Sequence, residues 1–301
     1  MNRAPRVSNS RNISPIYFML LIALTILWGF NWPAMKIVLM EASVWWFRTV
    51  CLAGGGAGLM FIAIISHQKI LLQRSQLKDL FICGLFLIFG WHIFTGYGVS
   101  ILPAGRSVII AFTMPLWAIL LGVPLLNESI SRRQILAVLS GLSGLIILIG
   151  PDLVAFKSSP LGVVFMLGAA ISWALGTILF KRMRWSAATI SVAAWLLLGG
   201  AIPFFLGAVL IQPAPNLLVL SDTAIIAFAY VLIFPMMFCQ WAYLKIVSVL
   251  PTNVAAISTL AIPIVGVFSS SLILGEEIGS RELISLILIS GALAGVLLPQ
   301  S

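Results

Sequence analysis

Charged residues are scarce in this chain of 301 residues, where Asp, Glu, Lys and Arg together contribute only 8%. Hydrophobic residues contribute 61%, whereas ordinary soluble domains have roughly 45–50% apolar and about 25% charged residues. Beyond residue 15 no polar stretch is long enough to form a soluble domain. This composition excludes a water-soluble fold, and it predicts an all-α integral membrane protein with no soluble domain.

Acidic residues are the rarer charged type, with eight in the sequence against 17 Lys and Arg. All eight fall in or beside expected loops: Glu41, Asp79, Glu128, Asp152, Asp222, Glu276, Glu277 and Glu282. The chain also lacks a His-Glu-x-x-His pattern and a Cys-x-x-Cys pair, and its only histidines are His67 and His92. We therefore expect no catalytic residues, no metal site and no cofactor, which argues against a membrane-embedded enzyme.

A continuous basic face is missing as well, although the net charge is +9. The basic residues form small groups between apolar segments, so nucleic acid is not an expected partner. About ten apolar windows of roughly 20 residues follow one another, each long enough to cross the hydrocarbon core of a bilayer. Their approximate centres are Leu27, Ala53, Ile88, Thr113, Gly141, Ile171, Leu198, Ile233, Leu260 and Ser290.

The distribution of basic residues predicts how the chain is oriented. If the amino terminus faces the cytoplasm, most basic residues fall on the inner side, and only Lys36, Arg106, Lys157 and Arg281 fall outside. This bias predicts a multi-pass protein with both termini in the cytoplasm. Arg48, near the start of the second window, is interpreted as a residue that snorkels to the interface and needs no functional role.

The two halves of the sequence match each other in order. Residues that coincide under a shift of 145 or 148 positions include Trp28 with Trp173, His92 with Gln240, Ser100 with Ser248, Pro115 with Pro263, and Glu128 with Glu276. These matches indicate a duplication, with residues 1–150 and 151–301 as two five-helix repeats of one membrane bundle. Because five is an odd number, the repeats are expected to be inverted around a central cavity, a recurring plan of secondary transporters.

Three segments carry a resemblance to a known family: Trp28 to Pro33, Met114 to Glu128, and Ile262 to Glu276. They resemble the EamA group of the drug/metabolite transporter superfamily and, within it, bacterial amino-acid exporters of the YddG type. The resemblance implies ten helices in the bacterial inner membrane, with spans 1, 3, 4, 6, 8 and 9 around a cavity and spans 5 and 10 at the periphery. Other members with this architecture move nucleosides, cofactors, polyamines or toxic cations.

Polar and aromatic side chains on the cavity-lining spans are the candidate substrate-binding residues. They are Trp28, Asn31, Trp91, His92, Thr95, Thr113, Trp173, Thr177, Gln240, Tyr243 and Thr259. His92 and Gln240 are expected at equivalent depths, where they could clamp a substrate or only hold helices together by hydrogen bonds. The three tryptophans could form an apolar wall for a flat side chain, or they could be structural.

Prolines, glycines and helix-end residues predict how the helices bend and pack. Pro33, Pro115 and Pro263 fall within expected helices, where proline removes a backbone donor, and we interpret them as hinges. Glu128 and Glu276 are interpreted as structural groups at helix ends, and Ser131 with Gln134 fits a capping box. The pairs Gly54 with Gly58 and Gly291 with Gly295 favour close packing within the chain, or a homodimer through the peripheral helices.

These patterns lead to one expected function with stated alternatives. A cavity with amide, hydroxyl, imidazole and indole groups suits a neutral zwitterion, so we expect export of amino acids with aromatic or other hydrophobic side chains. Since no acid lies at mid-membrane, gradient-driven uniport is expected, with weak proton coupling through His92 as the alternative. Export of nucleosides, drugs or cations and a channel or sensor role are the rival functions. The expected partners are the small-molecule substrate and the lipid bilayer, and the chain is expected to be a monomer or a homodimer.

Overall fold

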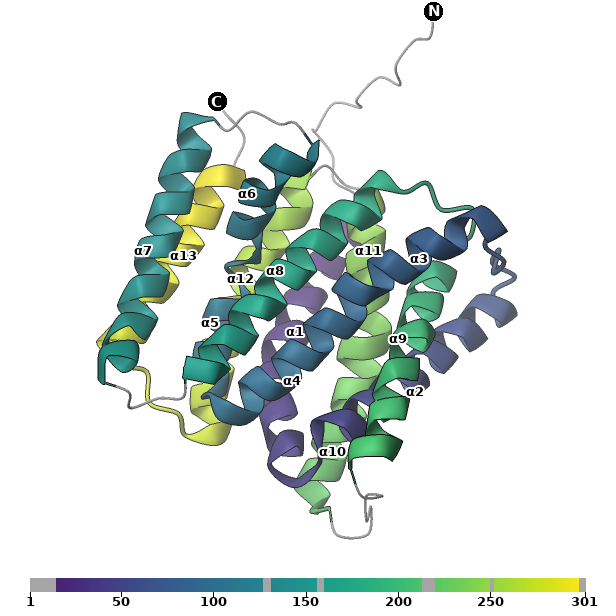
Figure 1. The fold of residues 1–301 in the computed structure, drawn as a ribbon, viewed down its shortest axis with the longest axis horizontal. Helices are drawn as coiled ribbons and strands as arrows, with labels where there is room; N and C mark the ends of the chain where they lie inside the picture. The colour runs from purple at the N-terminus through teal and green to yellow at the C-terminus, as the bar shows by residue number, and fades with distance from the viewer. Residues whose placement is uncertain (1–14, 127–130, 156–159, 213–219, 250–251, 298–301) are drawn as a thin grey trace, which may run out of the picture.

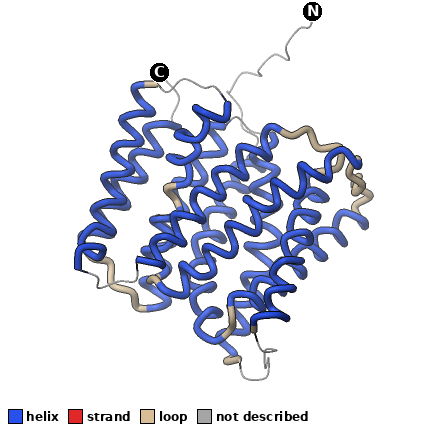
Figure 2. The backbone as a smooth tube through the Cα atoms, viewed as in Figure 1, coloured by secondary structure: helices blue, strands red, loops and turns tan. Residues whose placement is uncertain are grey.

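The computed structural model describes residues 15–126, 131–155, 160–212, 220–249 and 252–297. Every regular element in this part of the chain is helical, as Figure 2 shows. In chain order the elements are α1 (Pro15–Glu41), α2 (Val44–Ile65), the 3₁₀ turn η1 (Arg74–Gln76), α3 (Leu77–Gly84), the π-helix η2 (Leu85–Gly90), α4 (Trp91–Ile101), α5 (Ala104–Ala111), α6 (Met114–Leu126), α7 (Arg132–Ala155), α8 (Pro160–Arg182), α9 (Thr189–Ile211), α10 (Asp222–Val231), the π-helix η4 (Leu232–Cys239), α11 (Gln240–Val249), α12 (Thr252–Leu274) and α13 (Ser280–Leu297).

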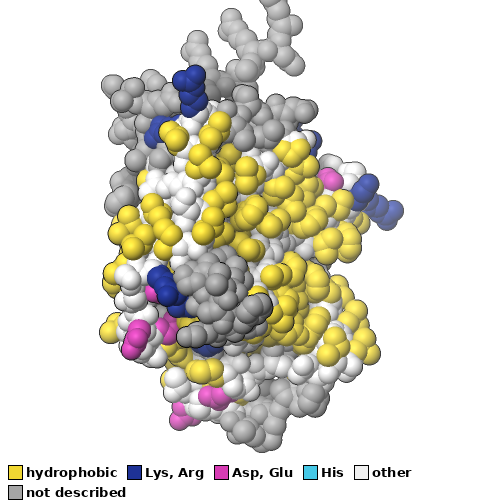
Figure 3. All heavy atoms as spheres, turned by 60° about the vertical axis from the view of Figure 1, so that its left-hand side comes forward, with side chains coloured by type: hydrophobic (Ala, Val, Ile, Leu, Met, Phe, Trp, Pro, Cys, Tyr) yellow, Lys and Arg dark blue, Asp and Glu magenta, His cyan; other side chains and the backbone are white. Residues whose placement is uncertain are grey.

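Seven helical stretches of the described residues are long and apolar enough to cross a membrane. They are Met19–Glu41, Val44–Ile65, Arg74–Ile101, Ala104–Gly122, Pro160–Arg182, Thr189–Ile211 and Asp222–Ile246. Large apolar side chains also cover the outside of the bundle: Leu210 and Leu272 are 81% and 82% exposed. Figure 3 shows a broad hydrophobic surface with the charged side chains gathered toward its ends. The prediction of an all-α membrane protein is confirmed.

Helices from distant parts of the sequence pack in pairs. α2 lies along α9, and α7 lies along α13 at one side of the bundle (Figure 1). α1 packs against α12 and α10, while α8 packs against α6, α5 and α4. α7 and α13 pack mainly against each other, and α13 also contacts α12 and α5.

Two of the long stretches contain a π-helix in their middle. In the stretch Asp222–Ile246, α10 ends at Val231, the residue four positions before Pro235. Because proline donates no N–H and its ring meets the carbonyl four residues earlier, the backbone widens into η4 there. η2 has no proline. There, Ser172 of α8 donates its hydroxyl to the Phe86 carbonyl at 2.8 Å and so satisfies an acceptor of the widened turn.

A third stretch is interrupted at Phe112 and Thr113, between α5 and α6. Pro115 lies four residues after Ala111, the last residue of α5, and it therefore cannot continue the hydrogen-bond ladder of that helix. α6 begins at Met114, one residue before this proline. In the first turn of a helix the backbone N–H groups have no acceptor within the helix, so the missing N–H of proline costs no hydrogen bond there. By contrast, Pro33 and Pro263 lie inside α1 and α12, which continue through them.

The predicted glycine pairs and the predicted capping box differ in the contacts that they make. A Cβ at Gly54 or Gly58 would meet Leu232 or Met237 of η4, so this glycine pair packs within the chain. A Cβ added at Gly291 would have no described atom within 4 Å. Gly295, the other member of that pair, lies outside the residues whose side chains the structure describes. The capping box is confirmed, because the Ser131 N–H donates to Gln134 Oε1 and the Gln134 N–H donates to Ser131 Oγ.

Candidate functional site

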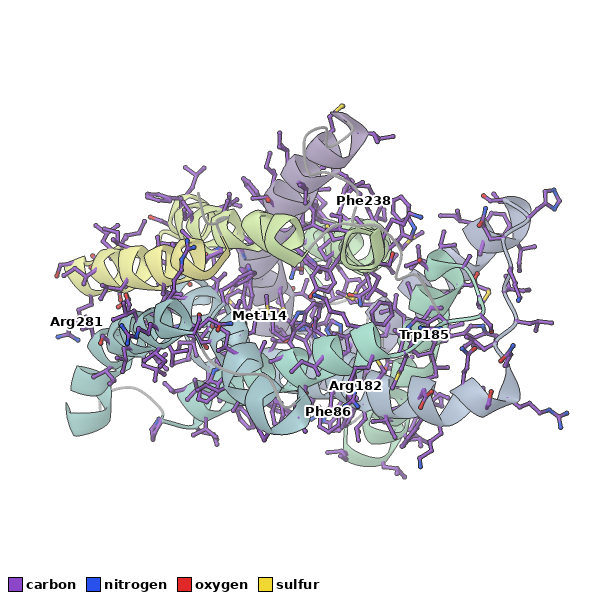
Figure 4. The ribbon with its side chains drawn as sticks, turned by 90° about the horizontal axis from the view of Figure 1, so that it is seen from above. Phe86, Met114, Arg182, Trp185, Phe238 and Arg281 are labelled. Atoms are coloured by element: carbon purple, nitrogen blue, oxygen red, sulfur yellow. The ribbon has the colours of Figure 1, made fainter. Side chains whose placement is uncertain are left out.

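A small cavity lies where helices of both halves of the chain meet. It is lined by Trp28, Asn31, Trp32 and Met35 of α1, Arg48 of α2, Trp91, His92 and Thr95 of α4, Phe112 and Met114 at the break before α6, Trp173 of α8, Met236 of η4, and Gln240 of α11. The view along the bundle in Figure 4 places Met114 toward its middle and Arg281 at its margin. The cavity is therefore central in the bundle.

Seven of the candidate residues named from the sequence line this cavity: Trp28, Asn31, Trp91, His92, Thr95, Trp173 and Gln240. His92 and Gln240 each follow a π-helix by one or two residues, so the two π-helices direct a polar side chain of each half into one space. The substrate-binding role of these residues remains a prediction.

Three other candidates, Thr113, Thr177 and Tyr243, are described and do not line the cavity. Thr177 and Tyr243 lie behind Trp173, where the Tyr243 hydroxyl is 3.2 Å from Thr177 Oγ1. Thr113 faces away from the cavity, because its hydroxyl donates to the Ile110 carbonyl and accepts from the Trp117 indole. The side chain of Thr259 is outside the described residues.

Aromatic rings form one wall of the cavity. The ring centroids of Trp91 and Trp173 are 4.7 Å apart, and those of Trp28 and Trp173 are 5.8 Å apart at a nearly perpendicular angle. The Trp173 indole N–H donates to the Tyr243 hydroxyl at 3.3 Å, and the Tyr243 ring contacts Trp28 at 5.4 Å. Edge-to-face and tilted pairs of this kind are the favourable arrangements of aromatic rings. The wall is thus held in place by ring contacts and one hydrogen bond.

Sequence reasoning missed several apolar residues of the lining. Trp32 and Met35 lie on the same face of α1 as Trp28 and Asn31, since positions 28, 31, 32 and 35 follow the helical repeat. That spacing could have found them. The other missed residues are Phe112, Met114 and Met236, which come from a helix break and a π-helix. No helical periodicity applies across such irregular backbone.

Arg48 is the main correction to the sequence analysis. It does not snorkel outward: it is 1% exposed and lines the cavity. Its Nη2 donates to Thr95 Oγ1 at 3.0 Å and to Met35 Sδ at 2.6 Å, and its guanidinium lies 4.9 Å from the Phe47 ring centroid. The side chain reaches inward because α2 turns this face toward α1 and α4, so both acceptors lie on those helices. A cation is therefore a central feature of the site.

Several polar atoms of the cavity have no hydrogen-bond partner in the described part of the chain. They are Asn31 Oδ1, Arg48 Nε, both ring nitrogens of His92, and Gln240 Nε2. Buried polar groups are normally paired, and an unpaired group typically costs about 1–3 kcal/mol. Four unsatisfied side chains around one space are the pattern expected of groups that bind the polar parts of a ligand.

The cavity itself is nearly closed. Its volume is about 30 Å³, whereas ligand pockets commonly have roughly 300–1,000 Å³. A space of this size holds a water molecule but not a metabolite. Side chains or helices around the cavity must therefore move before a small molecule enters.

Polar contacts tie the helices together at one end of the bundle. The Lys36 ammonium donates to the carbonyls of Val99, Ser100 and Leu102 at the end of α4. Just after α12, the Glu276 carboxylate accepts the Ala104 and Gly105 N–H groups at 2.7 and 2.8 Å. Glu276 thus caps the N-terminus of α5, which agrees with the structural role expected for it. We call these contacts of Lys36 and Glu276 the polar latch.

The course of α8 locates the opposite end of the bundle. Gly162 at the start of α8 packs against Leu102, so α8 begins at the latch end. α8 has 23 residues and therefore extends about 35 Å. A second hollow of about 300 Å³ lies at its far end, between α8, α9 and the end of α11, with Lys181 and Ser248 in its wall. Lys36 and Lys181 thus lie at opposite ends of the bundle.

Comparison with known proteins gives a family, relatives and a fold. A family model described as the EamA-like transporter family matches residues 15–150 and 160–298. A probable amino-acid metabolite efflux pump of Salmonella typhimurium is 24% identical and covers 91% of this chain and 92% of its own. An S-adenosylmethionine uptake transporter of Rickettsia bellii is 33% identical over 119 residues, 40% of each protein. One solved crystal structure superposes with a TM-score of 0.67 at 17% identity, covering 94% of this chain and 97% of that one, which shows similarity of fold.

Proposed function

This chain belongs to the EamA-like transporter family, and on that premise we propose that it exports amino acids with aromatic or other hydrophobic side chains from the bacterial cytoplasm. The observation that carries this proposal is the central cavity. Indole rings of Trp28, Trp91 and Trp173 form its apolar wall, while Arg48 and amide and imidazole groups supply its polar part. An amino acid with a flat apolar side chain has the same two-sided character.

The relative that matches over most of its length supports the direction and the substrate class. The Salmonella typhimurium relative is named a probable amino-acid metabolite efflux pump, and it matches this chain nearly from end to end. Among the described residues, no carboxylate lines the cavity, and the nearest charged group is the cation Arg48. A cationic drug or polyamine would be repelled by that charge. The cavity therefore favours a neutral zwitterion over a cation.

We further propose that the bundle has ten membrane-crossing helices in two inverted repeats, residues 1–150 and 151–301. The family model matches once in each half. Contacts between helices also recur when the halves are exchanged: α1 with α12 corresponds to α8 with α5 and α6, and α1 with α10 and η4 corresponds to α8 with α3 and η2. The π-helices η2 and η4 occupy corresponding places 147 residues apart, at Leu85 and Leu232.

In this proposal the substrate passes by alternating access. The polar latch closes the end of the bundle that contains Lys36, which the basic-residue bias assigns to the outside. The hollow beside Lys181 lies at the other end, which the same bias assigns to the cytoplasm. Substrate would enter from that side, and release requires the latch to open. The break at Pro115 and the prolines Pro33 and Pro263 are the proposed hinges.

Transport is proposed to be gradient-driven uniport. Among the described residues no acidic side chain lines the cavity, and His92 is the one histidine in its wall, the residue type most often used to exchange protons in the physiological pH range. If His92 coupled protons to transport, an imposed pH gradient would drive substrate uphill. In uniport, the same gradient leaves the distribution of a zwitterion unchanged.

Counterflow in proteoliposomes tests the function. Vesicles preloaded with unlabelled phenylalanine, tryptophan or leucine should transiently accumulate the radiolabelled amino acid, whereas vesicles tested with polyamines should not. His92→Ala and Gln240→Ala should reduce the signal by about tenfold or more if each side chain makes a buried polar contact with substrate. Gln68→Ala is the matched control, since Gln68 is exposed and its side-chain amide donates to the Ser66 carbonyl, outside the cavity lining.

Other outcomes of that assay identify the rival functions. If nucleosides or S-adenosylmethionine showed counterflow and amino acids did not, the amino-acid proposal would be wrong and one of those compounds would be the substrate. Flux that never saturates and shows no counterflow would indicate a channel. Uphill accumulation driven by a pH gradient at equal substrate concentrations would contradict uniport.

A further inference from the structure

The cavity contains a buried cation that has no anionic partner in the described residues. Arg48 lies in the membrane-crossing stretch Val44–Ile65 and is 1% exposed. The ion pair described in the structure, Arg106 with Glu282, involves other residues near the end of the bundle. An arginine inside a bilayer is rare and costly, and such residues mark substrate or ion pathways. Arg48 therefore calls for a functional explanation.

The contacts of Arg48 leave most of its donors free. A guanidinium has five N–H donors in a planar fork, and the two described hydrogen bonds both come from Nη2, to Thr95 Oγ1 and Met35 Sδ. Nε has no partner. Both acceptors are neutral, so the positive charge is held in place but not compensated.

Thr95 fixes the orientation of the guanidinium. Its hydroxyl hydrogen is directed to the Trp91 carbonyl, 2.8 Å away, in the preceding turn of α4. Its oxygen is therefore left as an acceptor for Arg48 Nη2 at 3.0 Å. This arrangement pre-orients the guanidinium beside the cavity, so a ligand need not order the long side chain when it binds.

We propose that Arg48 is the anion-binding group of the transport site, and that the substrate carries a carboxylate which the guanidinium holds. This inference rests on the proposed function, since it takes the central cavity as the transport site. The carboxylate would lie on the Arg48 and Thr95 side, and the apolar part would lie against Trp91 and Trp173. The unpartnered groups of Asn31, His92 and Gln240 are available for the other polar atoms of the substrate.

A carboxylate fits this site better than a phosphate does. Arginine binds a carboxylate through two parallel hydrogen bonds, which suits a single planar fork. A phosphate with two charges calls for convergent cations, and among the described residues Arg48 is the one Lys or Arg side chain in the cavity wall. The substrate class is therefore a small carboxylate with a flat or hydrophobic body, with or without an amino group.

Binding can be measured on the full-length protein in detergent by the quenching of its tryptophan fluorescence, because four tryptophans line the cavity. The probes are L-phenylalanine, 3-phenylpropionate, which lacks the amine, and L-phenylalaninol and phenethylamine, which lack the carboxylate. For the unmodified protein, the two carboxylates should bind at least about tenfold more tightly than the two amines, because a charge-assisted bond in a buried site is lost with the carboxylate.

Variants of Arg48 separate ligand binding from a structural role. Arg48→Gln should abolish the preference for carboxylates, and Arg48→Lys should retain part of it, because it keeps the charge but loses the planar fork. Arg74→Gln is the matched control, since Arg74 is exposed in η1 and far from the cavity in sequence. It should keep the full preference. Size-exclusion profiles of each variant report whether the bundle is folded.

Each outcome supports or overturns the inference. Equal binding of carboxylates and amines by the unmodified protein overturns it, and this comparison needs no variant, so a misfolded Arg48→Gln does not prevent the test. If the ratio of carboxylate affinity to amine affinity is unchanged in a folded Arg48→Gln variant, Arg48 only connects helices and the inference is wrong. If amino acids are transported in counterflow without any carboxylate preference, the proposed function stands and this inference fails. If no probe binds, both fail.

Discussion

At the scale of single residues, Tyr243 shows how a side chain outside the cavity can control its wall. Its hydroxyl accepts from the Trp173 indole at 3.3 Å and lies 3.2 Å from Thr177 Oγ1. Tyr243→Phe removes this anchor. We expect a loss of about 1 kcal/mol in stability, as for a typical hydrogen bond, together with a several-fold higher KM in counterflow, because Trp173 is then free to tilt.

Tyr97 provides the control for this prediction. Its hydroxyl accepts from the Trp45 indole at 2.8 Å, so Tyr97→Phe removes the same kind of bond at a site that does not line the cavity. Thermal unfolding should show a similar loss for both variants, and only Tyr243→Phe should change KM. Equal KM values for the two variants would mean that Trp173 does not need its anchor.

Residue identity alone predicted part of the site. Trp28, Asn31, His92 and Gln240 were found because polar and aromatic side chains are conspicuous in apolar helices. Arg48 was misinterpreted, since an arginine four residues into a helix is within snorkelling reach of the interface, and the sequence does not reveal which face of α2 meets α1 and α4. The direction of a side chain at a given depth is decided by tertiary packing.

At the scale of elements, the polar latch predicts how the bundle opens. Glu276 holds the N-terminus of α5 through two charge-assisted hydrogen bonds, each worth about 1.5–3 kcal/mol. Glu276→Gln keeps the size and shape of the side chain but removes its negative charge, so both hydrogen bonds to α5 become weaker. We expect a larger fraction of the molecules to adopt a conformation in which α5 has moved away from α12. Ser270 on α12 is buried beneath Gly105, and a Cβ added to that glycine would lie 3.9 Å from the Ser270 Cβ.

A cysteine placed at Ser270 reports that motion. We expect Ser270→Cys to react with a water-soluble maleimide about tenfold faster when combined with Glu276→Gln, which corresponds to a shift of about 1.4 kcal/mol. Glu277→Gln changes the neighbouring exposed glutamate and should leave the rate unaltered. Equal rates in all three proteins would show that Glu276 is a cap without influence on opening.

The close packing of α8 against η2 yields a stability prediction. A Cβ at Gly176 would lie 2.6 Å from the Leu87 backbone nitrogen, so Gly176→Ala forces two backbones apart and should cost about 1–3 kcal/mol. A Cβ at Gly199 on α9 meets nothing within 4 Å, and Gly199→Ala should stabilise the helix by about 0.5–1 kcal/mol. Thermal unfolding in detergent measures the stability of both variants. A Gly176→Ala variant as stable as the unmodified protein would contradict the close approach of α8 to η2.

Elements were predicted unevenly for a physical reason. Each of the expected window centres falls in a described helix or, for Thr113, in the break between α5 and α6, because apolar length alone decides where a chain crosses lipid. Pro115, which the sequence analysis interpreted as a hinge, lies beside this break. The π-helices were not foreseen: η2 depends on Ser172, a residue 86 positions away that satisfies the Phe86 carbonyl, and no local pattern contains that information.

At the scale of the whole molecule, the remaining question is which ends of the two halves face the same compartment. Ser100 and Ser248 coincide under the 148-residue shift, and both are exposed at the C-terminal ends of α4 and α11. In inverted repeats, equivalent residues lie on opposite sides of the membrane. In the structure, Lys36, which donates to the Ser100 carbonyl, lies at the other end of the bundle from the hollow that contains Ser248.

Labelling of these two positions in intact cells decides the arrangement. Ser100→Cys should react from outside with a membrane-impermeant maleimide, because the bias of basic residues assigns the latch end to the outer face. Ser248→Cys should react only after the membrane is permeabilised. The native cysteines Cys51, Cys83 and Cys239 are buried and give the unmodified protein a low background. If both positions were labelled from one side, the halves would be parallel, and alternating access about an in-plane axis would have no structural basis in this chain.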